Sequence, residues 1–362
     1  MAKNMDIQSI RKFIENKKIL ITGHTGFVGA WMCAALNYLG ADLIGFSLQE
    51  ETGSLYEKIK DHIKIKSYYG DIFNSIELER CMDENRPEIV IHNAAFVFIL
   101  KCEKDPYQTY ATNVMGTVNL LEIIRKRDYV RHLVGVSSDK VYKNLDYEKI
   151  LFSETDALDG GEPYSCSKTC QDLIIQSYYN TYFRQKNIGV SLFRPSNMIG
   201  GGDHHKIRLI PSIIDSIQKN ETLELRNPDA IRPWQDILDV IDAYLNVLYN
   251  NWGQGKLNIY NLGPTEDNIC SVREIVKIIE NIREDESGLN VAEAQKNGNI
   301  EKKYLGLSID KIKKNEDWMP RKELKKSLED LYFFYENDCG DNTYDLMIRN
   351  IEDYFLPDRR RD

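Results

Sequence analysis

Two side chains at the start of an expected helix have the residue types of a proton-transfer pair. Tyr164 and Lys168 stand four positions apart, so a helix places both side chains on one face. A tyrosine phenol has an unperturbed pKa near roughly 10, and an ammonium group beside it favours the phenolate. The pair is a candidate for removing a proton from a substrate hydroxyl, and a simple surface contact is the alternative interpretation.

A second polar group follows an apolar run over His132–Val136. Ser138, Asp139 and Lys140 bring a hydroxyl, an acid and an amine to the end of that run. In a parallel sheet the carboxyl ends of the strands border the ligand cleft, so these side chains are candidates for acid and base catalysis. The alternative is a polar strand end solvated by water.

Three glycines mark an expected binding loop for phosphate groups. Gly23, Gly26 and Gly29 follow the apolar run that begins at Lys18, and they open a segment with helical periodicity. Such glycines let backbone amides and the N-terminus of a helix approach a pyrophosphate. The loop therefore predicts a dinucleotide site.

The elements that must position these residues alternate between strand and helix. Apolar runs recur after Lys18 and at Ala41–Leu48, Glu88–Ala95, His132–Val136 and Gly189–Phe193, with helical patterns between them. This order predicts an α/β fold, a Rossmann-type doubly wound parallel sheet with a smaller mixed α/β C-terminal lobe for substrate. The expected boundaries are a dinucleotide-binding domain over 1–195 with 236–262 returning to it, a nucleotide-sugar-binding lobe over 196–235 and 263–340, and a C-terminal tail over 341–362.

Composition restricts the possible partners. The chain has 362 residues, of which 42% are hydrophobic and 28% are charged, so two globular domains are expected. No apolar run approaches the roughly 20 residues that span a bilayer, and Met1 to Asn16 lack an apolar signal core. We therefore expect a cytoplasmic enzyme without a membrane partner. The net charge of −9 disfavours nucleic acid as a partner.

The seven cysteines form no C-x-x-C pair, and we interpret them as reduced thiols. Cys166 and Cys170 lie one helical turn apart and are compatible in principle with a shared metal ion. No histidine or second cysteine pair accompanies them in the sequence, so small packing residues on a helix are the preferred interpretation. We expect no metal site.

The G-x-x-G-x-x-G spacing resembles the short-chain dehydrogenase/reductase superfamily, and in particular its extended branch, the NAD-dependent epimerase/dehydratase family. Gly70-Asp71-Ile72, His92-Asn93-Ala94-Ala95 and Thr112-Asn113-Val114 resemble further motifs of that branch. The resemblance implies catalytic roles for Ser138, Tyr164 and Lys168. The residues that it implies for cofactor binding are Gly23, Thr25, Gly26, Phe27, Val28, Gly29, Ser47, Asp71, Ile72, Ala94, Ala95, Asn113, Tyr164 and Lys168.

The end of the second expected strand bears on the choice of cofactor. Ser47 falls where Rossmann folds that prefer NAD often have Asp or Glu for the ribose hydroxyls. No arginine replaces that carboxylate, so a 2′-phosphate has no evident partner either. We expect NAD rather than NADP.

The substrate residues resemble those of the CDP-glucose 4,6-dehydratase group of this family. Ser-Asp-Lys-Val-Tyr from Ser138 and Gly-Gly-Glu-Pro-Tyr from Gly160 belong to this resemblance, as do the segments from Ser196 and from Arg232. It implies that Asp139 protonates the hydroxyl leaving carbon 6, that Lys140 removes the proton at carbon 5, and that a CDP-linked hexose is the substrate. The residues implied for binding this nucleotide-linked sugar are Asn197, Arg208, Leu209, Leu225, Arg226 and Arg232.

The chain departs from that pattern on the sugar side. Residues 96–103 read Phe-Val-Phe-Ile-Leu-Lys-Cys-Glu where the family has a polar stretch, and Val28 replaces a lysine. The sugar therefore stays open, and a nucleotide-sugar epimerase or carbon-4 oxidoreductase remains the alternative. A protein that binds dinucleotide without turnover is a further alternative. By the same resemblance we expect a homodimer that pairs helices over 113–127 and 163–180.

Overall fold

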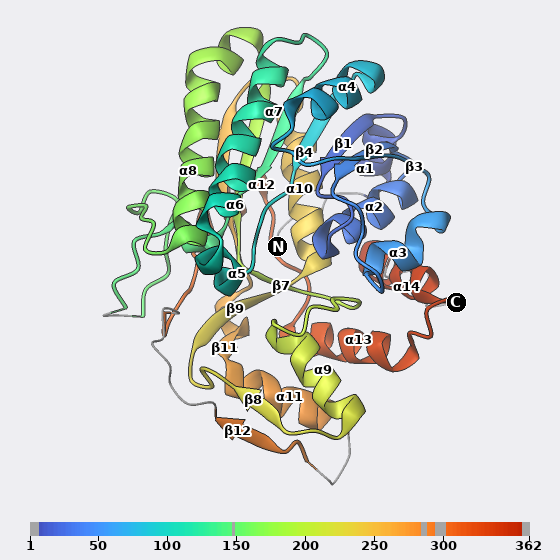
Figure 1. The fold of residues 1–362 in the computed structure, drawn as a ribbon, viewed down its shortest axis with the longest axis vertical. Helices are drawn as coiled ribbons and strands as arrows, with labels where there is room; N and C mark the ends of the chain where they lie inside the picture. Colours follow the sequence, from blue (N-terminus) through green and yellow to red (C-terminus); the bar gives the residue numbers. More distant parts are fainter. Residues whose placement is uncertain (1–6, 147–148, 284–287, 294–301, 357–362) are drawn as a thin grey trace.

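The computed structural model describes residues 7–146, 149–283, 288–293 and 302–356. A seven-stranded parallel sheet lies between two layers of helices, and a smaller lobe packs against the end of that sheet (Figure 1). The strand order is β10-β6-β5-β4-β1-β2-β3. The doubly wound sheet predicted from the sequence is confirmed.

Strands at the centre of the sheet consist of apolar residues that are buried on both faces. This is typical of parallel strands covered by helices on each side. The seven strands of the sheet, with the edge strands β10 and β3 included, are β1 (Lys18–Thr22), β2 (Asp42–Ser47), β3 (Ile65–Tyr69), β4 (Ile89–His92), β5 (His132–Val136), β6 (Gly189–Pro195) and β10 (Leu257–Leu262). The register pairs Thr22 with His92, and His92 with Gly135, so the carboxyl ends meet at one edge.

Each face of the sheet packs against its own layer of helices. One layer contains α1 (Ile7–Ile14), α2 (Phe27–Tyr38), α3 (Leu55–Ile59), α10 (Ile237–Asn251), α12 (Asp310–Glu316) and α14 (Thr343–Phe355). The opposite layer contains α4 (Ser75–Asn85), α7 (Gly116–Arg125) and α8 (Pro163–Tyr178). Two short helices, α5 (Ile99–Lys104) and α6 (Pro106–Tyr110), follow the loop after β4 and pack against α8.

The smaller lobe has an apolar core of its own. Its helices are α9 (Leu209–Lys219), α11 (Val272–Arg283) and α13 (Leu324–Asn337). Its strands are β7 (Asn197–Ile199), β8 (Leu223–Leu225), β9 (Ile231–Asp236), β11 (Ile269–Ser271) and β12 (Val291–Glu293). They form a three-stranded sheet in the order β11-β9-β7 and a β12-β8 pair.

Two of the expected boundaries need correction. The tail expected over 341–362 contains α14, whose Met347 and Ile351 are fully buried in the core beside α2, while residues 357–362 lie outside the described part of the chain. Within the expected lobe segment 263–340, Ile312 and Trp318 also belong to the core of the large sheet. Charged residues separate these apolar positions in the sequence, so the buried apolar face is not evident from composition alone.

None of the helices in the described part of the chain combines the length and the hydropathy needed to cross a bilayer.

Candidate active site

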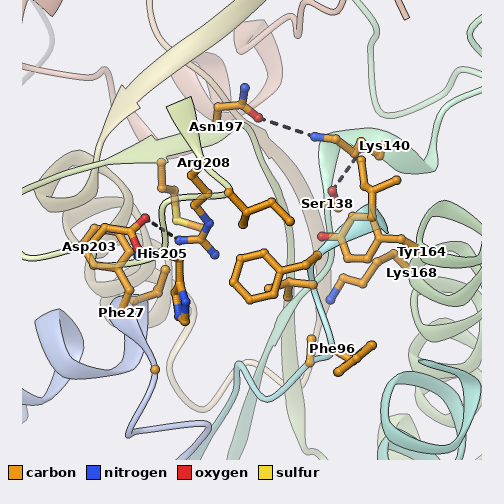
Figure 2. Close-up of a pocket in the computed structure, with 18 of the residues that line it drawn as sticks. Phe27, Phe96, Ser138, Lys140, Tyr164, Lys168, Asn197, Asp203, His205 and Arg208 are labelled. Carbon is orange, nitrogen blue, oxygen red and sulfur yellow. Dashed lines mark hydrogen bonds and ion pairs between the residues drawn. The ribbon is translucent and has the colours of Figure 1, made fainter. Parts of the chain in front are cut away.

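A cavity of 1280 Å³ lies between the carboxyl edge of the large sheet and the smaller lobe. Its walls come from the loops after β1, β2, β4 and β5, from the start of α8, and from the segments around α9 and β9 (Figure 2). Of the predicted site residues, all except Gly29 and Asn113 line this cavity. Residues up to 209 positions apart in the chain therefore meet at one place, as the sheet topology requires.

The first end of the cavity is formed by the glycine loop. Gly23 has a φ of +75°, which is the left-handed region that glycine adopts without strain. Gly26 is the N-cap of α2 and offers no capping side chain, so the amides of the first helical turn face the cavity. Gly29 serves packing instead, because a Cβ there would lie 2.2 Å from the Gly23 oxygen. Gly29 does not line the cavity, and its role in cofactor binding stays a prediction.

Neighbouring loops support the glycine turn. The Thr25 hydroxyl hydrogen-bonds to the Ser47 hydroxyl at 2.7 Å and donates to the Leu48 carbonyl at 3.1 Å. Asp71 accepts a hydrogen bond from the Phe73 amide, and the buried Ile72 packs beside Gly116. These contacts hold three loops in register around the first end of the cavity.

Asn113 lies behind the cavity wall rather than on it. Its Oδ1 accepts from the Phe96 amide at 2.7 Å, and its Nδ2 donates to the Phe96 carbonyl at 3.0 Å and to the Ser167 hydroxyl at 2.8 Å. The side chain is fully buried. Its amide fixes the loop after β4 to α8, and its role in cofactor binding stays a prediction.

Tyr164 sits in the first turn of α8. Pro163 occupies the start of the helix, and the Glu162 carboxylate caps it by accepting from the amides of Tyr164 and Ser165 at 2.6 and 2.8 Å. The phenol points toward Ser138 in the cavity (Figure 2). Burial raises the pKa of the Tyr164 phenol, and the Ser138 hydroxyl partly opposes that rise.

Lys168 is buried one turn further along α8. Its ammonium donates to the Val136 carbonyl at 2.7 Å and to the Gln171 side chain. Desolvation lowers the pKa of Lys168 to about 7, so it exchanges its proton near neutral pH. Burial therefore shifts the two pKa values in opposite directions, upward for the Tyr164 phenol and downward for the Lys168 amine.

Asp139 and Lys140 form a pair beside the tyrosine. Asp139 is almost fully buried, and its Oδ1 accepts from the Ser138 hydroxyl at 3.1 Å and from the Lys140 ammonium at 3.2 Å. The other carboxylate oxygen, Oδ2, is buried without a hydrogen-bond partner. Lys140 also donates to the Asn197 side chain at 3.5 Å. The strand end therefore holds a connected set of a hydroxyl, a carboxylate and an amine.

Three arginines of the small lobe line the opposite end. The Arg208 guanidinium pairs with Asp203 at 2.7 Å, Arg226 donates to the Ile207 carbonyl at 3.1 Å, and the largely buried Arg232 donates to the Ile231 carbonyl at 2.8 Å. The nonpolar Leu209 and Leu225 lie on the same wall. A cationic and partly apolar wall suits a nucleoside diphosphate.

Comparison with known proteins agrees with this arrangement. Residues 19–263 match the family described as the NAD dependent epimerase/dehydratase family. The chain belongs to this family. It is 35% identical to CDP-glucose 4,6-dehydratase of Salmonella typhimurium over 88% of this chain and 90% of that protein, and 26% identical to CDP-paratose 2-epimerase of Salmonella typhi over 87% and 98%.

Solved structures of the family have the same fold. The dTDP-glucose 4,6-dehydratase of Bacillus anthracis, in complex with NAD, superposes with a TM-score of 0.74 at 26% identity and covers 89% of this chain and 97% of that one. The UDP-glucose 4-epimerase of Thermus thermophilus, with NAD, superposes with a TM-score of 0.75 at 20% identity over 89% and 99%.

The glycine end of the cavity fits the dinucleotide of this NAD-dependent family. A Cβ on Gly26 would meet only the Gly23 oxygen, at 3.5 Å, so the space beyond it stays open to the cavity. The uncapped amides of α2 face that space and favour an anionic group. Gly23, Thr25, Gly26, Phe27, Val28, Ser47, Asp71, Ile72, Ala94 and Ala95 surround it.

Sequence reasoning missed the residues that join the two lobes. Phe98, from the loop that departs from the family pattern, packs edge-on against His205 with ring centroids 4.7 Å apart, and Arg208 lies 5.2 Å from the centre of the same ring. Glu51 approaches His204 and His205 from the loop after β2. The adjacent histidines were a visible signal, since the chain has only six, but their partners depend on loop geometry.

Proposed function

We propose that this protein is an NDP-sugar 4,6-dehydratase that acts on a CDP-linked hexose. The observation that carries the proposal is the Asp139–Lys140 pair at 3.2 Å, in the same cavity as Tyr164 and the glycine loop. Carbon-4 oxidation alone needs one base, whereas loss of water across carbons 5 and 6 needs a further acid and base. The 35% identity to a CDP-glucose 4,6-dehydratase supports the same assignment.

NAD, held at the glycine loop, would supply a hydride acceptor for carbon 4 and a hydride donor for carbon 6. Tyr164, once its phenol has given up its own proton to water, removes the proton of the hydroxyl on carbon 4, and the Ser138 hydroxyl favours the ionised form by opposing the rise of the phenol pKa. The ketone that results acidifies the hydrogen on carbon 5. Because the pKa of Lys168 is lowered to about 7, its side chain carries a positive charge in only part of the molecules at neutral pH.

The Asp139–Lys140 pair carries the single proton that the elimination needs. While Asp139 and Lys140 form an ion pair, the carboxylate has no proton to donate and the ammonium cannot accept one. Transfer of one proton from Lys140 Nζ to Asp139 Oδ1, along their 3.2 Å hydrogen bond, produces a neutral acid and a neutral amine. Asp139 then protonates the hydroxyl that leaves carbon 6 as water, and Lys140 takes the proton from carbon 5 and returns it after reduction of carbon 6. Exchange with water then takes from Tyr164 the proton that came from the carbon-4 hydroxyl and returns one proton to the Asp139–Lys140 pair.

The cationic wall of the small lobe would hold the nucleotide. Arg208 and Arg232 are assigned to the diphosphate, Asn197 to the sugar phosphate, and Leu225 with Arg226 to the base, with Leu209 beside them. Arginine suits a diphosphate because its planar fork donates two parallel hydrogen bonds. Arg208 has to exchange part of its contact with Asp203 for the phosphate.

A second candidate function stays open because Phe96, Val97 and Phe98 line the cavity where the family has a polar stretch. A nucleotide-sugar epimerase or carbon-4 oxidoreductase would use Tyr164 and Ser138 in the same way, and Asp139 and Lys140 would only orient the sugar.

We further propose a homodimer paired through the layer of α6, α7 and α8. Five large hydrophobic side chains on or directly next to these helices are exposed, and these are Tyr107, Tyr110, Met115, Leu173 and Tyr182. Burying such a patch against a second copy removes it from water. Sedimentation at micromolar concentration should give the mass of two chains, and a strictly monomeric profile would contradict this assembly.

Product analysis tests the proposed reaction. We expect incubation with CDP-glucose to yield a 4-keto-6-deoxy sugar nucleotide, with a mass lower by one water and incorporation of one solvent deuterium at carbon 5. Turnover that retains the hydroxyl on carbon 6, with any of the CDP-, dTDP- or UDP-linked hexoses, would favour the epimerase or oxidoreductase instead.

A further inference from the structure

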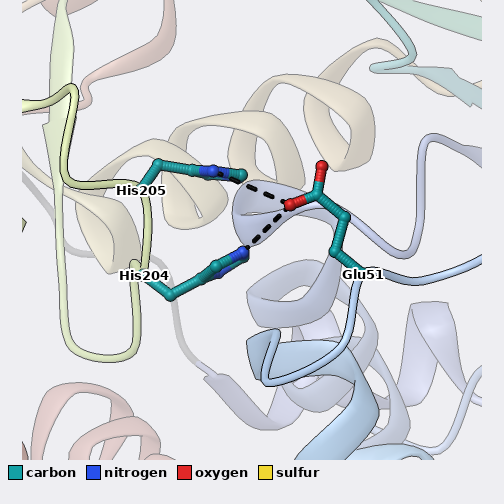
Figure 3. Close-up of side chains that lie close together, drawn as sticks. All are labelled: Glu51, His204 and His205. Atoms are coloured by element: carbon teal, nitrogen blue, oxygen red, sulfur yellow. Dashed lines mark hydrogen bonds and ion pairs between the residues drawn. The ribbon is translucent and has the colours of Figure 1, made fainter.

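Three potential metal ligands converge at the mouth of the cavity. Glu51 comes from the loop after β2, while His204 and His205 come from the segment between β7 and α9 (Figure 3). Glu51 Oε2 lies 3.3 Å from His204 Nε2 and 3.9 Å from His205 Nδ1. The three ligand atoms all lie within 4.8 Å of one another.

These separations are close to those of a metal centre. Nitrogen and carboxylate ligands bind Zn²⁺ at roughly 2.0 to 2.2 Å, so neighbouring ligands of a tetrahedral ion stand about 3.3 to 3.6 Å apart. The 3.3 Å contact already has this length, whereas the 3.9 Å contact and the separation of the two histidine nitrogens, which is within 4.8 Å, require side-chain rotation. Two histidines and one glutamate are also a ligand set that zinc uses when a fourth position stays open.

The segment that carries the histidines is held in place. Asp203 precedes them, accepts from the His205 amide at 3.2 Å and pairs with Arg208 at 2.7 Å. Its carbonyl accepts from the Tyr335 hydroxyl of α13 at 2.6 Å. Phe98 packs against the His205 ring. The backbone that carries the two imidazoles is therefore anchored. Glu51 provides the third ligand from the other side of the cavity mouth.

The charges around the cluster suit a cation. Glu51 supplies a carboxylate oxygen, and His204 and His205 supply ring nitrogens. With both imidazoles neutral, as metal binding requires, the ligand set would carry a net charge of −1.

We propose that Glu51, His204 and His205 form a binding site for a divalent transition-metal ion of the Zn²⁺ class, with its remaining coordination position open to the cavity. The ion would join the loop after β2 to the small lobe. Because all three residues line the same cavity as the N-terminus of α2 and Arg208, the open position faces the region assigned to phosphate oxygens. This differs from the sequence-based expectation of no metal site.

The surroundings set the expected affinity. The second ring nitrogen of His204, Nδ1, is buried without a hydrogen-bond partner, and the Glu51 side chain is 64% exposed. Outer-shell partners of metal-bound histidines typically contribute 10 to 100-fold in affinity. We therefore expect one Zn²⁺ per chain with a dissociation constant in the micromolar range.

The test uses tag-free protein with its cofactor retained. Zn²⁺ binding is measured by competition with a chromogenic chelator, and Co²⁺ is used for its visible absorption. We expect one equivalent of Zn²⁺ and a Co²⁺ spectrum of nitrogen and oxygen ligands. His204→Gln with His205→Gln, and separately Glu51→Gln, should weaken binding at least tenfold without changing the thermal melting temperature in chelator.

Two controls make the result decisive. His62→Gln alters a histidine that stacks on Tyr344, away from the cavity, and should leave metal affinity unchanged. Cys166→Ser with Cys170→Ser removes the other feasible ligand pair and should also have no effect. The proposal fails if no stoichiometric ion binds, if the histidine variants bind as tightly as the parent protein, or if the cysteine variant alone loses the ion.

Discussion

At the scale of single residues, the chemistry depends on where one proton resides. Asp139 and Lys140 are adjacent in sequence and linked at 3.2 Å, and Ser138 adds a second hydrogen bond to the same carboxylate oxygen. The other oxygen, Oδ2, is buried without a hydrogen-bond partner. The carboxylate is therefore coupled through its Oδ1 to both neighbouring side chains.

This coupling predicts different defects for two variants. Asp139→Asn should preserve oxidation at carbon 4 but block loss of water, because a carboxamide cannot supply the proton. General acid catalysis contributes roughly 10² to 10⁴-fold, and the rate of water loss should fall by that order. Tyr164→Phe should instead suppress the first oxidation. Release of hydrogen from carbon 5 and formation of the 6-deoxy product are measured in both variants.

The two variants also separate the candidate functions. Product formation at the parental rate by Asp139→Asn, with Tyr164→Phe inactive, would contradict the role of Asp139 and favour the epimerase or oxidoreductase. Both proteins should keep the parental melting temperature to within a few degrees, which confirms that the fold is intact.

A second prediction at this scale concerns Arg232, which is 8% exposed on the cavity wall. Arg232→Ala should weaken nucleotide-sugar binding by roughly 1.5 to 3 kcal/mol, the usual contribution of a hydrogen bond to a charged group. Calorimetric titration with the nucleoside diphosphate measures the loss. Arg273→Ala is the control, because Arg273 pairs with Asp229 and Glu293 outside the cavity. An unchanged affinity in Arg232→Ala would show that this residue does not contact the diphosphate.

The sequence was informative about residues whose roles follow from spacing. The four-residue interval of Tyr164 and Lys168 and the glycine intervals predicted side chains that do line one cavity. The sequence did not predict which way each side chain points. Asn113 carries a motif of the family, yet its amide points to Phe96 and Ser167, and only the three-dimensional packing of α8 on the loop after β4 decides this.

At the scale of elements, β5 shows how burial ties stability to pH. His132 begins the strand, is fully buried, and bonds to Ser191 of β6 at 2.8 Å. Desolvation lowers its pKa to about 4 in the folded protein, against roughly 6.5 in an unfolded chain. His24 and His92 are lowered in the same direction by burial.

The sign of the effect follows from proton binding. Between pH 6.5 and about 4 the unfolded chain binds more protons at these histidines, so the free energy of unfolding falls as pH falls. His132 alone should account for up to about 2 kcal/mol between pH 7 and pH 5. Urea unfolding at both values should show a smaller loss for His132→Gln than for the parent protein. An equal loss would show that His132 is not the group responsible.

The sequence predicted a secondary-structure element correctly where all residues of that element are buried. β5 begins and ends at the predicted residues, because every one of its residues is buried and the apolar run in the sequence coincides with the strand. β3 was not predicted, because Lys-Ser-Tyr-Tyr on a half-exposed edge strand lacks an apolar run. α14 was missed for the opposite reason, since its buried residues are spaced among charged ones and are recognised only against α2.

At the scale of the whole molecule, the two lobes are tied together around the cavity. The Trp31 indole of α2 donates to the Gly201 carbonyl at 3.0 Å, and Phe98 reaches Arg208 and His205 across the cavity. Glu51 approaches the same segment from the loop after β2. No single motif in the sequence encodes these contacts, because each depends on how the small lobe docks on the sheet.

This enclosure predicts how the protein handles its cofactor. A dehydratase takes a hydride from carbon 4 and returns it to carbon 6, so it has no need to exchange the dinucleotide between turnovers. Contacts across the cavity mouth should slow its release. We therefore expect oxidised NAD to copurify with the protein and to be identified by mass spectrometry after denaturation. On mixing with substrate, absorbance of the reduced nicotinamide should rise only transiently and in proportion to the enzyme. Steady accumulation of reduced cofactor in solution would contradict the internal return of hydride and would identify a net dehydrogenase instead.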